Sequence, residues 1–244
     1  MRYALASLGF INEDIQHNKN VIIDAMIRCA ADADIVLFGE AFLQGFYGAT
    51  FDPTHDAQLA LSPDDAVIQE IRTAAKQHGV AVSFGFIEKD GPLFYSSQMT
   101  IGSDGTVLDL YRRISPGWKE RFAGEQYREG DGFHCFPLMS QSVAVALCGD
   151  LWYDENILAM NQLHPDIVLW PVYTDFNFNV WNTSMKHEYA TQAGKISSKV
   201  LYVNSVCKDK DGDEIARGGA VLYANGSIVQ ELPAGKEGIL ILDI

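Results

Sequence analysis

The chain has 244 residues, 48% of them hydrophobic, which is enough to bury a full core and predicts a single domain over residues 1–244. Its 32 acidic residues outnumber 18 Lys and Arg, and the formal net charge of -14 repels nucleic-acid phosphates and anionic membrane surfaces. We therefore expect neither nucleic acid nor a membrane as a partner, and favour a small-molecule substrate.

The first fourteen residues predict a strand rather than an export signal. They contain one basic residue, and acidic residues follow before the apolar stretch reaches the length of a signal-peptide core. No apolar run approaches the roughly 18 residues of a membrane helix, and the four cysteines lack metal-site spacing. We expect a soluble, reduced, cytoplasmic protein without metal or cofactor, in which three cysteines are buried small side chains: Cys29, Cys135 and Cys207.

Short apolar, β-branched runs alternate with amphipathic stretches along the chain, a pattern typical of an α/β domain with buried strands. Turn signals at residues 104–105, 130–132 and 225–226 lie between such runs and predict hairpins or tight loops, so we expect mixed sheets. The predicted strands are Tyr3–Ser7, Ile35–Phe38, Val80–Phe86, Val143–Leu147, Ile167–Trp170, Val200–Val203 and Ala220–Tyr223.

Two helices are well marked. The first is predicted to begin at Ser62, which can cap it, and to end near His78. The second is predicted from Trp181 to Ser198, and side chains spaced by four residues put one face toward the core: Met185, Tyr189 and Ala193.

A strand-like run over residues 142–147 ends in Cys148, which is followed by Gly149. Reacting groups gather at strand ends in α/β proteins. A neighbouring base can convert this thiol to a thiolate, and the backbone N–H of Gly149 is open to a developing oxyanion. The segment predicts a nucleophile, although the last apolar residue of a buried strand gives the same pattern.

The run over residues 35–39 has the same form and ends in Glu40. Burial would raise the pKa of this carboxyl group and make it a better general base toward a thiol or water. A glutamate in a surface loop is the alternative. Spacing alone does not show that Glu40 and Cys148 meet.

Three ordered motifs resemble those of the nitrilase superfamily of carbon–nitrogen hydrolases. Residues 38–46 resemble the motif of the catalytic glutamate, and residues 148–155 resemble that of the nucleophilic cysteine. Between them, residues 104–113 resemble the stretch that normally ends in tyrosine, arginine and the catalytic lysine. The resemblance extends over nearly the whole chain.

This resemblance implies a four-layer αββα sandwich of two mixed β-sheets flanked by helices, and assembly into a homodimer or higher homo-oligomer. It also implies hydrolysis of a small amide or N-carbamoyl compound through a thioester on Cys148, with Glu40 as the base and no metal or cofactor. Two alternatives stay open. One is a nitrilase that acts on nitriles, and the other is a catalytically impaired protein used for ligand binding or assembly.

The chain departs from the family at the lysine position, which is occupied by Arg113. Arginine stays charged and is limited to electrostatic support, so the exchange is not conservative. We hypothesise that Lys119, in a Pro/Gly loop, supplies the missing amine while Arg113 clamps the oxyanion or substrate. A solvated loop lysine is the alternative.

Further site residues are predicted in the same region. Glu125 best matches the second family glutamate, which orients the lysine or substrate, and Glu120 is the runner-up. Aromatic side chains are expected to line the pocket, although core packing would equally explain them: Trp118, Trp152 and Tyr173.

Overall fold

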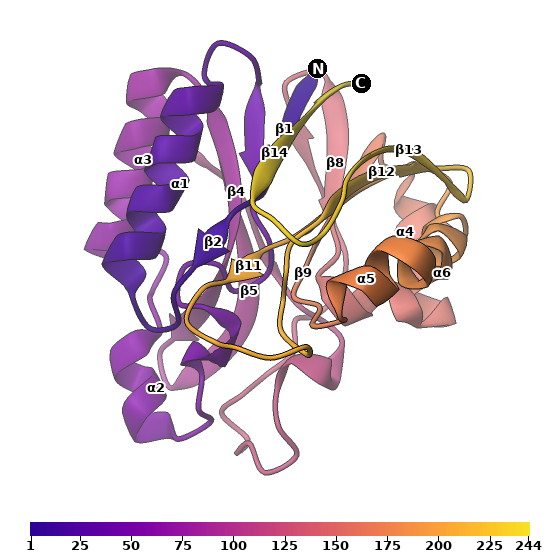
Figure 1. Ribbon diagram of the computed structural model, residues 1–244. Coiled ribbons are helices and arrows are strands. Elements are labelled where there is room, and N and C mark those ends of the chain that lie inside the picture. The colour runs from indigo at the N-terminus through magenta and orange to yellow at the C-terminus, as the bar shows by residue number, and fades with distance from the viewer.

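The computed structural model describes residues 1–244 and contains two six-stranded mixed sheets that face each other, with helices on both outer faces (Figure 1). The first sheet has the order β14 (Gly238–Asp243), β1 (Arg2–Ser7), β3 (Ile35–Leu37), β4 (Ala81–Asp90), β5 (Leu93–Ile101) and β6 (Val107–Arg112). The second has the order β13 (Ser227–Leu232), β12 (Ala220–Ala224), β10 (Lys199–Asn204), β9 (Ile167–Val172), β8 (Gln141–Val145) and β7 (Cys135–Leu138). This is the expected αββα sandwich.

Helices α1 (Ile15–Cys29) and α3 (Ala66–His78) cover the first sheet, and α4 (Asp154–Leu163) and α6 (Lys186–Ala193) cover the second (Figure 1). Shorter elements are α2 (Pro53–Leu59), α5 (Phe178–Val180) and a parallel pair, β2 (Gly9–Phe10) with β11 (Val206–Cys207). Single helical turns occur at Phe46–Gly48, Pro116–Trp118, Cys148–Trp152 and Trp181–Met185. None of the helices has the length and apolar character needed to span a membrane.

Three apolar layers hold the sandwich together. The central layer joins the sheets and includes Leu5 and Leu37 from one side with Val145 and Leu169 from the other. The two outer layers lie between each sheet and its helices. Because strands of both sheets are buried on both faces, they consist of near-continuous apolar runs, as strands in parallel sheets do.

All seven predicted strands are present with ends shifted by a few residues, and the hairpin turns at residues 104–105 and 225–226 are confirmed. Two helix boundaries were wrong. Asp65, not Ser62, caps α3, because its carboxylate accepts the backbone N–H of Val67 at 3.1 Å. The second helical stretch ends at Ala193 rather than Ser198. A Cβ added at the next residue, Gly194, would lie 2.6 Å from Gly226 Cα in the β12–β13 turn.

Two glycines let the backbone around residue 40 pack tightly between the sheets. A Cβ added at Gly39 would lie 2.5 Å from Ser205 Oγ and 2.9 Å from the carbonyl of Val172. A Cβ at Gly85 on β4 would lie 2.7 Å from the carbonyl carbon of Glu40. The segment that carries Glu40 is therefore fixed by backbone contacts, which leave no room for a methyl group.

The variant Gly85→Ala should lose about 1–3 kcal/mol of unfolding free energy, because the added methyl group meets backbone that cannot rotate away. Urea unfolding measures the loss. Gly124→Ala is the matched control, since its added methyl group meets only the side chain of Gln126. Equal stability of the two variants would contradict the tight packing.

Candidate active site

Three chemically active side chains follow the carboxyl ends of strands: Glu40 after β3, Arg113 after β6 and Cys148 after β8. The two sheets meet at this edge, where the backbone N–H of Glu40 donates to the carbonyl of Val172 at the end of β9, at 3.2 Å. Side chains from both sheets therefore share one site, as is common at the carboxyl edge of α/β proteins.

Glu40 is completely buried. Its Oε1 accepts hydrogen bonds from Ser96 Oγ and from Arg113 Nη1, each at 2.9 Å. Its Oε2 is also buried and has no partner. Buried carboxylate oxygens are normally hydrogen-bonded, and this oxygen is free to accept a proton.

Arg113 is buried and holds Glu40 in an ion pair. Its Nε donates to Ser115 Oγ at 2.8 Å, while none of its hydrogen bonds uses Nη2. A Cβ added at Gly149 would lie 2.6 Å from that Nη2, so the guanidinium lies directly against the residue after Cys148. Burial lowers the pKa of Arg113, but the attraction of Glu40 and Cys148 outweighs it and raises the pKa overall, so the group stays charged.

Cys148 lies at a sharp turn with a φ of 41°, in the left-handed region that non-glycine residues rarely adopt. The indole N–H of Trp170 donates to its carbonyl at 2.8 Å, and its thiol donates to the carbonyl of Tyr173 at 3.4 Å. Burial raises the pKa of the thiol to about 12; Glu40 also raises this pKa, and Arg113 lowers it. The resting nucleophile is therefore a protonated thiol that needs a base.

The structure brings Glu40, Arg113, Cys148 and Gly149 together but not Lys119. The ammonium group of Lys119 donates to the carbonyl of Tyr127 at 2.8 Å and pairs with Glu129 at 2.7 Å. It makes no hydrogen bond or ion pair with Glu40 or Cys148. The hypothesis that Lys119 supplies the missing amine is therefore not supported by its contacts, because a nearer carboxylate holds it.

The two glutamates proposed for the second acidic role, Glu125 and Glu120, are both exposed in the loop between β6 and β7 and make no ion pair. The carboxylate in this loop that contacts a lysine is Glu129, which the sequence motif did not select.

The predicted aromatic lining is largely core. Trp118 is buried beside Phe51 and Tyr127, and its indole N–H has no partner. The ring of Tyr173 stacks on Phe46 with centroids 4.2 Å apart, so this residue offers Cys148 its carbonyl rather than its ring. Trp152 is 42% exposed and follows Cys148 by four residues, which keeps it as a candidate for the site entrance.

Sequence reasoning missed the residues that hold the site from behind. Ser96 on β5 and Ser115 after β6 each bond one of the charged groups. Serines in strands and loops are common, so no local pattern distinguished them. Asp150 lay within the cysteine motif but carried no assigned role, although it accepts hydrogen bonds from four groups.

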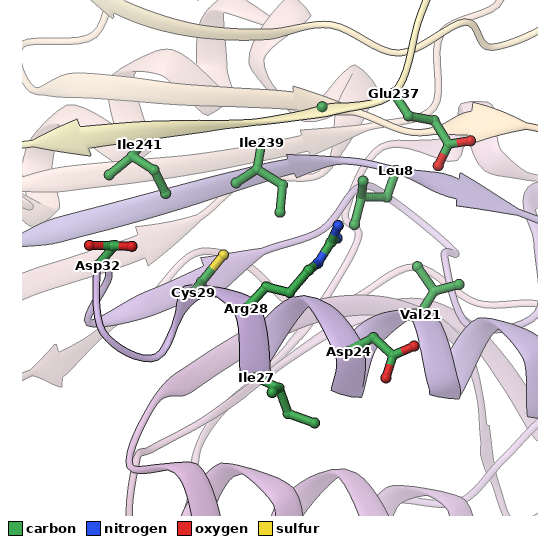
Figure 2. Close-up of a pocket in the computed structure, with 11 residues that line it drawn as sticks. Leu8, Val21, Asp24, Ile27, Arg28, Cys29, Asp32, Glu237, Ile239 and Ile241 are labelled. Atoms are coloured by element: carbon green, nitrogen blue, oxygen red, sulfur yellow. The ribbon is translucent and has the colours of Figure 1, made fainter.

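A surface pocket lies away from these residues, between α1 and β14 (Figure 2). It has a volume of about 800 Å³, and Arg28 and the thiol of Cys29 face an apolar wall that includes Ile239 and Ile241. None of Glu40, Arg113 or Cys148 lines it. No cluster of three or more His, Cys, Asp or Glu side chains is arranged to hold a metal ion.

Comparison with known sequences relates the chain to enzymes that act on carbon–nitrogen bonds. The family model of carbon-nitrogen hydrolases matches residues 8–244. An (R)-stereoselective amidase of a Pseudomonas species is 26% identical over 98% of this chain and 82% of its own length. A bromoxynil-specific nitrilase of Klebsiella pneumoniae subsp. ozaenae is 33% identical, over 54% of this chain and 39% of the nitrilase. The N-carbamoylputrescine amidase of Solanum lycopersicum is 28% identical over 68% of this chain and 57% of its own length.

Among solved structures, an amidase from Nesterenkonia sp. AN1 has a similar fold. It superposes with a TM-score of 0.81 at 21% identity, over the whole of this chain and 92% of the amidase. A variant of that amidase carries acrylamide added to its active-site cysteine.

The pKa of Cys148 predicts how its thiol reacts in the absence of substrate. Because the thiolate is the reactive form, alkylation by iodoacetamide should be slow at neutral pH and keep rising through the mildly alkaline range without a plateau. Peptide mass spectrometry measures each cysteine separately, and Cys135, which is also partly exposed, is the internal comparison. A plateau for Cys148 near neutral pH would show that the thiolate already exists in the resting site.

Proposed function

This chain belongs to the carbon-nitrogen hydrolase family, and we propose that it hydrolyses a small amide or N-carbamoyl compound through a thioester on Cys148. The observation that carries the proposal is the bare Oε2 of the buried Glu40, in a site where Arg113 fixes the other oxygen of the same carboxylate and lies beside the turn of Cys148. A protonated thiol, a base with a free oxygen and a fixed cation are the parts that acyl transfer requires.

In the proposed reaction Glu40 Oε2 removes the proton of Cys148, and the thiolate attacks the carbonyl carbon of the substrate. The oxyanion that forms is stabilised by Arg113 Nη2 and the backbone N–H of Gly149. The carbon–nitrogen bond breaks as Glu40 returns the proton to the leaving ammonia or amine. Glu40 then deprotonates a water molecule, which attacks the thioester, and the carbon–sulfur bond breaks as Glu40 returns this proton to the sulfur, which releases the acid and restores the thiol.

The relatives favour an amide over a nitrile as substrate. The amidase relative aligns over 98% of this chain, whereas the nitrilase relative aligns over 54%. A nitrile would give the same kind of cysteine adduct, so nitriles belong in any substrate panel.

We assign the cationic role to Arg113 rather than Lys119. Arg113 is ion-paired with Glu40, while Lys119 is bound by Glu129. Because arginine does not release its proton at physiological pH, its role is charge stabilisation, and all proton transfer is left to Glu40.

Three broader properties stay predictions of the same proposal: one domain over residues 1–244, assembly into a homodimer or higher oligomer, and a cytoplasmic location.

Ammonia release from a panel of small amides, N-carbamoyl compounds and nitriles tests the function. Turnover should be highest with amides or carbamoyl compounds and should vanish in Cys148→Ala, because the thioester needs the thiol. Mass spectrometry of the quenched reaction should find an acyl group on Cys148 only. Unchanged turnover in Cys148→Ala, or no turnover across the panel, would refute the proposal.

The choice between the two cations has its own test. Arg113→Gln should lower kcat by roughly 10²–10³-fold, the usual effect of removing a group that stabilises an oxyanion. Lys119→Ala should keep most of the activity, and Arg128→Gln, an exposed change in the same loop, is the control. If Lys119→Ala is as damaged as Arg113→Gln while both remain folded, Lys119 is the catalytic cation.

A further inference from the structure

A buried tyrosine and a buried aspartate lie behind the site and take no part in the proposed reaction. The hydroxyl group of Tyr111 on β6 donates to Asp150 Oδ2 at 2.6 Å, and both side chains are essentially inaccessible. Tyr111 precedes Arg113 by two residues, and Asp150 follows Cys148 by two. The pair thus connects the strand that carries the cation with the turn that carries the nucleophile.

Asp150 accepts hydrogen bonds both from the segment around Arg113 and from its own turn. Its Oδ2 also accepts the backbone N–H of Leu147 at 2.8 Å, and its Oδ1 accepts the backbone N–H groups of Ser115 at 2.8 Å and Ile114 at 3.2 Å. Leu147 directly precedes the nucleophile, and the other two residues directly follow Arg113. One carboxylate therefore sets the distance between the nucleophile turn and the cation segment.

The contacts continue from this carboxylate to the reacting groups. Ser115, fixed through its backbone by Asp150, accepts a hydrogen bond from Arg113 Nε through its hydroxyl group. Arg113 in turn holds Glu40. A shift of Asp150 would consequently displace the guanidinium group of Arg113 relative to the thiol of Cys148. The two segments are in close contact, since a Cβ added at Gly149 would lie 2.6 Å from Arg113 Nη2.

Only the ionised form of Asp150 can accept four donors, because a protonated carboxyl group would present an O–H to one of them. Burial raises the pKa of Asp150 above its ordinary value, and the Tyr111 hydroxyl, Arg113 and Ser115 limit that rise. The charged and titratable groups around Asp150 are Tyr111 and Arg113 from the β6 side and Cys148 on its own turn. Tyr111 therefore helps to keep Asp150 ionised.

We propose that Tyr111 and Asp150 are positioning residues, which fix Cys148 at its working distance from Arg113 and touch no reacting atom. This inference rests on the proposed function. It adds a requirement beyond the three reacting residues. The site works only while the carboxylate of Asp150 is charged and hydrogen-bonded.

The variant Tyr111→Phe tests the pair with little disturbance, since the ring keeps its stack on Phe133, whose centroid lies 5.9 Å away at an interplanar angle of 1°. We expect kcat to fall roughly tenfold with little change in KM, the size of effect of a lost hydrogen bond to a charged group. We also expect the acid limb of the kcat profile to move to higher pH, because loss of the hydroxyl raises the pKa of Asp150. Asp150→Asn should lower kcat further.

Tyr95→Phe is the matched control, because Tyr95 is another buried tyrosine, on β5, and its ring packs against Arg112 rather than against one of the reacting residues. If Tyr111→Phe only lowers the unfolding free energy and leaves kcat and the acid limb as in the wild type, the positioning role is overturned.

A substrate-free readout separates this inference from the proposed function. Iodoacetamide alkylation of Cys148 should be slower in Tyr111→Phe than in Tyr95→Phe, because a displaced Arg113 stabilises the thiolate less. If the wild-type protein hydrolyses nothing in the panel, the function fails but a slower alkylation still supports the positioning role. Equal alkylation rates in the two variants would overturn it.

Discussion

The ion pair between Glu40 and Arg113 is the interaction on which the rest of the site depends. Both groups are buried, and removing two charges from water costs several kcal/mol per ion unless geometry and further hydrogen bonds offset it. Ser96 and Ser115 supply those hydrogen bonds on either side of the pair. The arrangement satisfies one oxygen of Glu40 fully and leaves the other bare, so the features that stabilise the pair also direct its reactivity.

The same burial explains why the nucleophile needs its neighbours. A thiol in this environment stays protonated, and the fixed charges act on it in opposite directions, with Glu40 raising its pKa and Arg113 lowering it. The strained turn at Cys148 is held at its carbonyl by Trp170, and the thiol hydrogen bonds to the carbonyl of Tyr173. The second sheet thus positions the thiol of Cys148, while the charged groups that act on it, Glu40 and Arg113, come from the first sheet.

Much of the fold follows from short-range pattern. Apolar runs such as β3 and β9 are continuous because both faces are buried, so the sequence predicts them well. Cys148 and Glu40 could be selected because each directly follows such a run. The position of Lys119 could not be predicted, because the carboxylate that holds it, Glu129, belongs to an irregular loop whose path depends on tertiary contacts. The serines behind the ion pair were missed for a similar reason, since their role exists only after distant strands meet.

The arginine at position 113 also determines which groups of the site can transfer a proton. A lysine there could lend a proton to a departing group and recover it from water, whereas the guanidinium keeps its protons. In the proposed cycle Glu40 then carries two protons in turn, one from sulfur to the leaving group and one from water back to sulfur, and no other group carries either. The identity of the leaving group consequently matters more than in a site with two proton donors: a nitrogen that accepts a proton readily departs readily, and a weakly basic one does not.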